Sequence, residues 1–251
     1  MGSSARNAVI IFMQVGAKHW RWRTGVPSPL VSFAVRAIIL DLDNCLAAAD
    51  EVGESLLEPV FTAVRAANDG ALTESELDAA FGDCWVHAFD FVAMRHDFTP
   101  AMRTAGWEAF RQIEVHTPMH GYGDLALLPA IGRQRFLVTS GFRRLQESKV
   151  RALGIEPYFD AIVVDAIDEP AHRGKERIFR DLMSQFSLEA SDVLVVGDNP
   201  DSELAAAARL GLRSAQIVRP GVTPADGVTI HLSGLAELRD WLCSTIPPRR
   251  P

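Results

Sequence analysis

Two carboxylates, Asp41 and Asp43, stand at the end of the apolar run Ala37–Leu40. The run predicts a short buried strand, and spacing i, i+2 directs both acids toward the same side. An aspartate such as Asp41 is ionised at neutral pH and can act as a nucleophile or a metal ligand. Asp43 lies beside that charge and could be held protonated as an acid. Taken alone, the pair favours a simpler interpretation, an acidic loop that caps the next helix.

Three more chemically useful residues stand at the ends of predicted elements. Thr139 and Asp198 end apolar runs, and Lys175 opens a predicted helix. We expect them to meet Asp41, because the carboxyl ends of parallel strands share one edge of a sheet. A lysine and a hydroxyl group can hold phosphoryl oxygens, carboxylates can hold a hard cation, and one carboxylate can attack in line. Each residue alone is ordinary, but the set together indicates phosphoryl transfer.

The scaffold for these residues is predicted by the alternation of strand and helix patterns from about residue 124 onward. Continuous Val/Ile runs separated by helices predict a parallel sheet that is covered on both faces. We therefore expect an α/β fold, a doubly wound (Rossmann-like) parallel sheet formed by residues 36–46 and 124–251. Strands are expected at 37–40, 135–139, 161–164, 192–197, 215–218 and 228–230, and helices at 143–153, from 175, at 201–210 and at 233–242.

The segment that follows the first strand has a helical pattern. Thr73–Glu76 has the spacing of a capping box, and the apolar periodicity from Leu77 to Phe89 predicts one helix after it. Thr99–Pro100 opens another helix, and an earlier one is expected at about 55–67. Residues 47–123 are therefore predicted to form a helical insert in the sheet domain.

Composition limits the kind of protein this chain can be. Its 25 basic and 32 acidic residues give a net charge of −7, which argues against a general nucleic-acid surface. Cys45, Cys84 and Cys243 form no Cys-x-x-Cys pair, which fits a reducing, cytoplasmic setting and gives no support to a zinc site. Residues 1–35 are expected to be a poorly ordered leader. Their apolar run Val9–Met13 is far too short to span a membrane, and no membrane partner is expected.

At these positions the sequence resembles the haloacid dehalogenase (HAD) superfamily, in the phosphatase branch with a helical cap inserted after the first motif. The resemblance extends over about residues 36–243. It rests on four motifs in the family's order, which are Asp41–Leu46, Val138–Gly141, Lys175 and Val196–Glu203. It implies a phosphohydrolase core and a cap, residues 47–123, that closes over the site and selects the substrate.

The resemblance also implies a role for each motif residue. Asp41 would be the nucleophile that forms an aspartyl-phosphate, and Asp43 would protonate the leaving group and then activate water. The phosphoryl group would be bound by Thr139 and Lys175, together with backbone amides near Asn44 and Ser140.

For the cofactor, the resemblance implies Mg²⁺. The ion would be held by Asp41, the main-chain carbonyl of Asp43 and Asp198, with Glu203 or Asp201 acting through water. The implied activity is hydrolysis of a small phosphate monoester, so the expected partner is a small phosphorylated metabolite. We expect a monomer or a homodimer.

Two positions depart from the usual family pattern. Cys45 stands where the family usually has Thr, so a hydroxyl bond that braces the catalytic loop would be lost, and we expect weaker organisation with activity retained. Glu203 stands where Asp is commoner, and its longer side chain could still reach the metal.

Several other activities are compatible with the same residues. A phosphotransferase of the phosphoglucomutase type would use all of them, and a haloacid dehalogenase would need Asp41 but neither a metal nor Asp43. A phospho-receiver module combines a similar Asp, hydroxyl and Lys, but the second acid and the large insert speak against it. A non-catalytic binding protein is indicated only by Cys45.

Overall fold

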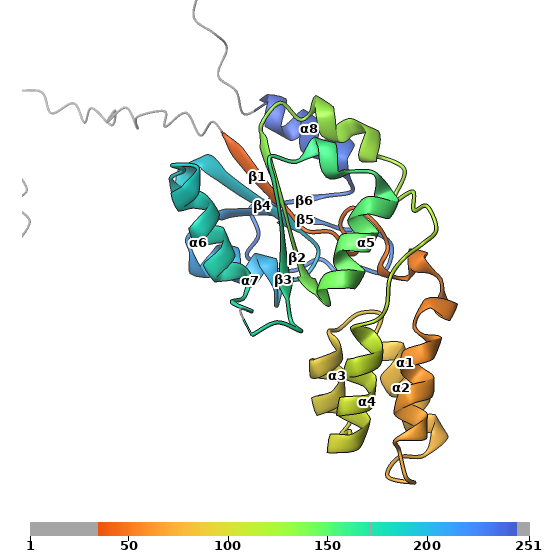
Figure 1. Ribbon diagram of the computed structural model, residues 1–251. Coiled ribbons are helices and arrows are strands. Elements are labelled where there is room, and N and C mark those ends of the chain that lie inside the picture. Colours follow the sequence, from red (N-terminus) through yellow and green to blue (C-terminus); the bar gives the residue numbers. More distant parts are fainter. Residues whose placement is uncertain (1–34, 171, 245–251) are drawn as a thin grey trace, which may run out of the picture. The chain divides into compact units, whose positions relative to one another are not determined.

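A parallel sheet organises the part of the chain that the computed structural model describes, residues 35–170 and 172–244. Within these residues the sheet has six strands in the order β3-β2-β1-β4-β5-β6, and every neighbouring pair is parallel (Figure 1). The strands are β1 (Ala37–Leu40), β2 (Gln134–Gly141), β3 (Ala161–Ala166), β4 (Val193–Gly197), β5 (Arg213–Ile217) and β6 (Ile230–Leu232). The predicted α/β, doubly wound fold is confirmed.

Helices cover both faces of the sheet. β1 is apolar at every position, so it presents apolar side chains to both faces, and each face needs a covering layer. Ile38 and Leu40 point into one buried cluster, whereas Ala37 and Ile39 point into another on the opposite face. The first cluster is completed by α5 (Arg143–Leu153) and α8 (Leu235–Ser244), and the second by α6 (Lys175–Gln185) and α7 (Glu203–Arg209) (Figure 1). A strand buried on both sides needs an uninterrupted apolar sequence, and this is what the run at 37–40 provides.

The order of the strands reverses at β1. From β1 the chain adds β2 and β3 on one side, and it then crosses to β4, β5 and β6 on the other. In such sheets, ligands bind outside the carboxyl ends of the strands at this point. The backbone N–H of Asp41 extends the ladder by donating to Val196 O at 2.9 Å. The acids after β1 and β4 are thereby brought to the same place.

Four helices occupy the sequence between β1 and β2. They are α1 (Glu58–Ala66), α2 (Glu74–Asp83), α3 (Phe89–Arg95) and α4 (Pro100–Phe110), and we refer to them as the helical insert. The predicted capping box is present, since Glu76 N donates to Thr73 Oγ1 and Thr73 N donates to Glu76 Oε2. The buried side chains of the insert form one cluster that also contains Phe142 and Leu145 beside and within α5. The division into a catalytic core and a cap stays a prediction.

The single helix predicted from Thr73 to Phe89 is wrong. The structure has two helices there, because α2 ends at Asp83 and α3 begins at Phe89. Phe81 and Phe89 are both buried in the same cluster, so the apolar spacing continues across the break and conceals it. The residue that follows α3 contacts the last residue of α2, since His96 Nε2 lies 2.8 Å from Asp83 Oδ2.

Smaller differences concern the ends of elements. Thr139 was expected to end its strand, but β2 continues to Gly141. Short 3₁₀ helices are present at Ala49–Val52, Glu54–Leu56, Leu125–Ala130, Glu156–Tyr158 and Ala190–Asp192. Apart from Val35, the predicted leader lies outside the described residues. No helix within those residues combines the length and the apolar character that crossing a membrane requires.

Candidate active site

Lys175 joins two carboxylates at the carboxyl edge of the sheet. It is the first residue of α6, and its Nζ donates to Asp41 Oδ1 at 2.9 Å and to Glu203 Oε2 at 2.8 Å. All three residues are buried. Burial acts to lower the pKa of Lys175, but the Asp41 and Glu203 carboxylates outweigh it and raise that pKa. Lys175 is therefore held as an ammonium group beside the predicted nucleophile.

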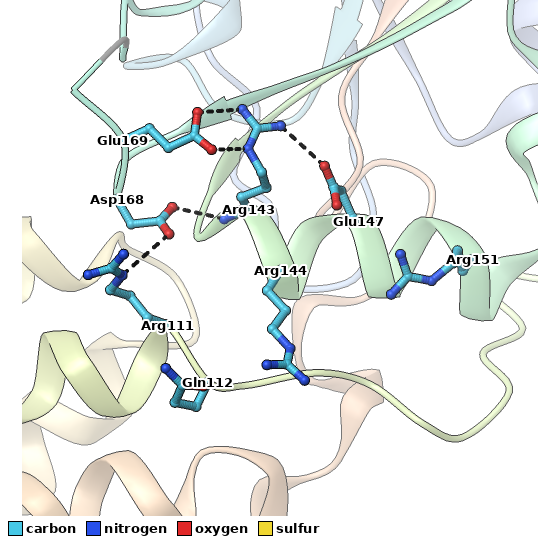
Figure 2. A pocket seen from close by; sticks show the side chains of 8 residues that line it. All are labelled: Arg111, Gln112, Arg143, Arg144, Glu147, Arg151, Asp168 and Glu169. Carbon is cyan, nitrogen blue, oxygen red and sulfur yellow. Dashed lines mark hydrogen bonds and ion pairs between the residues drawn. The ribbon is translucent and has the colours of Figure 1, made fainter.

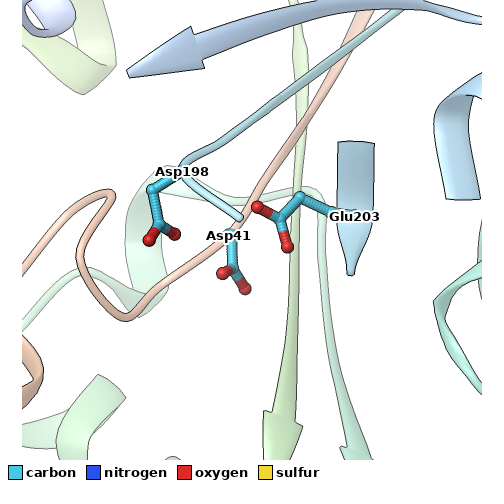
Figure 3. Close-up of side chains that lie close together, drawn as sticks. All are labelled: Asp41, Asp198 and Glu203. Carbon is cyan, nitrogen blue, oxygen red and sulfur yellow. The ribbon is translucent and has the colours of Figure 1, made fainter. Parts of the chain in front are cut away.

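Three carboxylates gather around this point. Asp41 follows β1, Asp198 follows β4 and Glu203 begins α7, and each offers an oxygen atom within 4.8 Å of the other two (Figure 3). Burial raises the pKa of Asp198 to about 8, and the neighbouring Asp41 and Glu203 carboxylates add to the effect. Burial likewise raises the pKa of Asp41 to about 7, because the nearby Lys175 ammonium group offsets only part of the effect of burial. The single Lys175 ammonium group is therefore not enough to stabilise the ionised form of all three carboxylates.

The donor set fits a divalent hard cation. When all three carboxylates are ionised, they and the single Lys175 ammonium leave two negative charges, which a divalent ion would balance. Carboxylate oxygens are the ligands that Mg²⁺ prefers in proteins. Asp41, Asp198 and Glu203 would hold the ion, with the main-chain carbonyl of Asp43 as a further predicted ligand.

Of the two acids predicted to complete the metal shell, Glu203 belongs to the cluster. It is 1% exposed, and its Oε1 accepts from Asn199 N at 2.7 Å. Asp201 is exposed, and its N–H donates to Asn199 Oδ1 at 2.9 Å. The turn from 198 to 202 therefore directs Glu203 inward and leaves Asp201 at the surface.

Asp43 is held by two donors from α5. Lys149 Nζ donates to Asp43 Oδ1 at 2.7 Å, and Gln146 Nε2 donates to Asp43 Oδ2 at 3.0 Å. From the sequence we considered only the charge of Asp41, which could hold Asp43 protonated, and neither donor was predicted. The role of Asp43 as an acid stays a prediction.

The predicted phosphate-binding residues differ in whether their polar groups already form hydrogen bonds within the protein. Thr139 is buried within β2, and within the described residues its hydroxyl group forms no hydrogen bond. Ser140 Oγ donates to Asp165 Oδ2 at 3.4 Å. Asn44 adopts a left-handed backbone conformation with φ 55°, and its N–H donates to Ala47 O at 2.6 Å. The Asn44 N–H is therefore engaged within its own turn, and phosphate binding by backbone amides near Asn44 stays a prediction.

Sequence reasoning missed Asp165, which positions Lys175. Asp165 is 4% exposed, and its Oδ1 accepts from the backbone N–H groups of Arg173 and Gly174, each at 3.2 Å. These bonds fix the backbone directly before α6. The signal was present, since Asp165 follows Ile162–Val164 just as Asp41 follows its own apolar run. Lys149 and Gln146 were missed because an interior helix position gives no sign of a distant partner.

Cys45, which stands where the related family usually has Thr, is completely buried. Its Sγ lies 3.8 Å from Val196 O, so a weak thiol hydrogen bond is available where a hydroxyl bond was expected to be lost. Arg219 Nε donates to Cys45 O at 3.2 Å, and Arg219 Nη2 forms two hydrogen bonds to Asp124. The loop after β1 is therefore anchored by a buried arginine as well as by the thiol.

A separate hollow of about 350 Å³ lies beside α5 (Figure 2). Its lining residues come from α5, the end of α4 and the segment after β3, and they are Arg111, Gln112, Arg143, Arg144, Glu147, Arg151, Asp168 and Glu169. Arg143 binds Glu147 and Glu169, and Arg144 and Arg151 bind Glu114. None of the predicted site residues lines this hollow, and its guanidinium groups already have carboxylate partners.

Comparison with solved structures supports the fold. The chain resembles a HAD phosphatase from Thermococcus onnurineus, with a TM-score of 0.56 and 21% identity over 83% of this chain and 98% of that one. It also resembles the HAD-hydrolase YfnB from Bacillus subtilis in a structure bound to magnesium, with a TM-score of 0.52 and 16% identity over 83% and 98%. At these identities the likeness concerns the fold alone.

Comparison with characterised sequences gives relatives of moderate similarity. The chain is 28% identical to pyrimidine 5′-nucleotidase YjjG of Escherichia coli over 70% of this chain and 75% of that protein. It is 24% identical to glyceraldehyde 3-phosphate phosphatase of Pyrococcus abyssi over 55% of this chain and 60% of that protein. Residues 35–211 match the haloacid dehalogenase-like hydrolase family, and this chain is a member of that family.

Proposed function

We propose that this protein is a magnesium-dependent phosphatase that hydrolyses a small phosphate monoester through an aspartyl-phosphate on Asp41. The observation that carries the proposal is the contact of Lys175 with Asp41 beside the Asp198 and Glu203 carboxylates. An ammonium group and a cation-binding cluster beside a carboxylate nucleophile are what in-line phosphoryl transfer requires. The nucleotidase and phosphatase relatives support a phosphate ester as the substrate.

In the first proposed step, an Asp41 oxygen attacks phosphorus while the bond from phosphorus to the ester oxygen breaks. The alcohol leaves with a proton supplied by Asp43, which must therefore carry one when the ester reacts. Lys175, together with the free hydroxyl group of Thr139, would orient the phosphoryl oxygens. The metal, when bound, would neutralise charge on the phosphoryl group.

In the second step, water attacks the phosphorus of the aspartyl-phosphate and gives a proton to Asp43. The bond between phosphorus and the Asp41 oxygen breaks, so the Asp41 carboxylate is restored and inorganic phosphate leaves. Asp43 carries a proton again and is ready for the next ester. The products are one alcohol and one phosphate for each water consumed.

We further propose that the helical insert acts as the cap over this site and that the substrate is a small phosphorylated metabolite met in the cytoplasm. The insert follows the loop after β1, and beyond its last helix Tyr122 N donates to Leu46 O at 3.2 Å, so the chain returns to that loop before it enters β2. An element in this position can close over the substrate and exclude water. We expect a monomer or a homodimer.

The test is phosphate release from a panel of sugar phosphates, nucleotides and small alkyl phosphates, with Mg²⁺ and with EDTA. We expect turnover only with the metal, and loss of about 10³-fold or more in Asp41→Asn. Arg180→Gln on the exposed face of α6 is the control and should keep full activity. Equal activity in Asp41→Asn would refute the proposal, and halide release from a haloacid without metal would replace it with dehalogenation.

A further inference from the structure

Lys149 is a buried lysine that no step of the proposed reaction uses. It lies inside α5, and its side chain is 6% exposed. Burying an ammonium group is costly unless a charged partner compensates. Its one hydrogen-bond partner in the described part of the chain is Asp43, at 2.7 Å. The fold therefore places the Lys149 ammonium group against Asp43, the proposed general acid and base.

Gln146 reaches the other oxygen of the same carboxyl group. It precedes Lys149 by three residues on α5, so both side chains lie on one face of the helix. Gln146 is 4% exposed, and its Nε2 donates to Asp43 Oδ2 at 3.0 Å and to Ser140 O at 3.2 Å. Both of these atoms are acceptors, so the amide can only present its NH₂ end to them.

The backbone makes room for this contact. A Cβ atom on Gly141 would lie 2.6 Å from Gln146 Nε2, and Gly141 has φ +152°. A side chain at 141 would therefore push the amide away from Asp43. Glycine at the end of β2 lets the start of α5 approach closely enough for Gln146 to reach the carboxyl group.

The two buried lysines of the site serve different carboxylates. Lys175 contacts Asp41 and Glu203, whereas Lys149 contacts Asp43. Two donors on two oxygens fix the plane of the Asp43 carboxyl group as well as its position. A general acid or base works only when it is held within hydrogen-bond reach of the reacting oxygen.

We propose that Lys149 and Gln146 are positioning residues, which hold the Asp43 carboxyl group where it can exchange a proton with the leaving-group oxygen and then with water. The inference rests on the proposed phosphatase function, and it adds two residues that act through Asp43 without touching the phosphoryl group. Asp43 remains about a quarter exposed on its side chain, so solvent can replace a lost donor without leaving a buried charge.

The experiment compares Lys149→Met and Gln146→Leu with wild type on two esters. An alkyl phosphate has a poor leaving group that needs a proton, whereas 2,4-dinitrophenyl phosphate leaves without one. We compare kcat/KM, which reports the steps up to release of the alcohol and leaves out the later attack of water. We expect kcat/KM on the alkyl ester to fall by about 10- to 100-fold and kcat/KM on the dinitrophenyl ester to change by less than about threefold. Arg151→Met is the matched control, because it removes one charge from α5 without touching Asp43.

A second measurement asks whether Lys149 acts through Asp43. If it does, Lys149→Met should cost nothing further in an Asp43→Asn background. Gln146→Leu changes no charge and gives the same test should Lys149→Met unfold, which thermal unfolding will reveal. Equal losses of kcat/KM on both esters, or losses that add to those of Asp43→Asn, would overturn the inference. An active wild type with unchanged variants would overturn this inference alone, whereas a wild type that releases no phosphate from any ester would overturn the proposed function as well.

Discussion

Glu203 fills the space that a side chain at Gly197 would need. A Cβ atom on Gly197 would lie 2.2 Å from Glu203 Oε1, closer than any real contact of that kind. Gly197 ends β4 and directly precedes Asp198. Because Glu203 stands where the family usually has Asp, its longer side chain folds back over the strand end, and only glycine leaves room for it.

The first prediction concerns this contact. In Gly197→Ala, the methyl group should displace Glu203 from Lys175 and from the carboxylate cluster, so phosphatase activity should fall by about tenfold or more. The measurement is kcat with saturating Mg²⁺. Gly82→Ala in α2 is the control, because nothing lies within 4 Å of a Cβ atom at that position. A Gly197→Ala protein with wild-type activity would show that the site tolerates a displaced Glu203.

The second prediction concerns pH and stability without metal. Burial raises the pKa of Asp41 to about 7 and that of Asp198 to about 8. Between about pH 4 and those values the folded protein keeps protons that the unfolded chain has lost, so stability falls as the pH rises. In EDTA, Tm should be lower at pH 8 than at pH 5.5 by roughly 5 °C.

Asp198→Asn provides the comparison, because it removes one of the two carboxylates. Its Tm should fall less between pH 5.5 and pH 8 than that of the wild type. Mg²⁺ should raise the wild-type Tm more at pH 8 than at pH 5.5, since the ligands must be ionised to bind it. A wild-type Tm that does not change across this range would contradict the raised pKa values.

The third prediction concerns the reactivity of the cysteines. Burial, with the nearby Asp41 and Asp198 carboxylates, raises the pKa of the Cys45 thiol well above its ordinary value, and Cys45 is completely buried. A thiol in this state is a poor nucleophile. Iodoacetamide should modify the exposed Cys243 in the native protein and leave Cys45 unmodified, as measured by peptide mass spectrometry. Labelling of Cys45 at a similar rate would show that the loop after β1 opens readily.

The fourth prediction concerns Thr at position 45. In Cys45→Thr, the hydroxyl group can donate to Val196 O more strongly than the thiol does across 3.8 Å. We expect activity at least equal to that of the wild type and an unchanged or higher Tm. Cys45→Ala removes the donor and should lose stability. A large loss of activity in Cys45→Thr would instead indicate that the buried space is shaped for sulfur.

The fold was largely predictable because apolar runs buried on both faces have few other interpretations. The apolar runs at β1 and β4 predicted parallel strands, and the acids that follow these runs indicated the edge of the sheet where Asp41 and Asp198 meet. The break between α2 and α3 was not predictable from periodicity, since Phe81 and Phe89 pack into one cluster from two helices.

The site was predictable only where its residues follow strands or open helices. Lys175 and Glu203 stand at helix starts, and the four-motif pattern identified them. Lys149 lies in the interior of a helix, and its role depends on a partner 106 residues away in the chain. A contact of this kind is created by the packing of α5 against the sheet, and no local pattern encodes it.

The place of the helical insert has a consequence for how the chain is synthesised. Ala37 in β1 pairs with Gln134 in β2 and with Val193 in β4, so both neighbours of β1 leave the ribosome long after it does. At ordinary rates of translation, the wait for β4 is on the order of ten seconds. The helices of the insert have mostly local contacts and can begin to fold during this interval. The apolar strand β1, which precedes the proposed nucleophile Asp41, cannot, and until its neighbours arrive it is a segment from which aggregation can start.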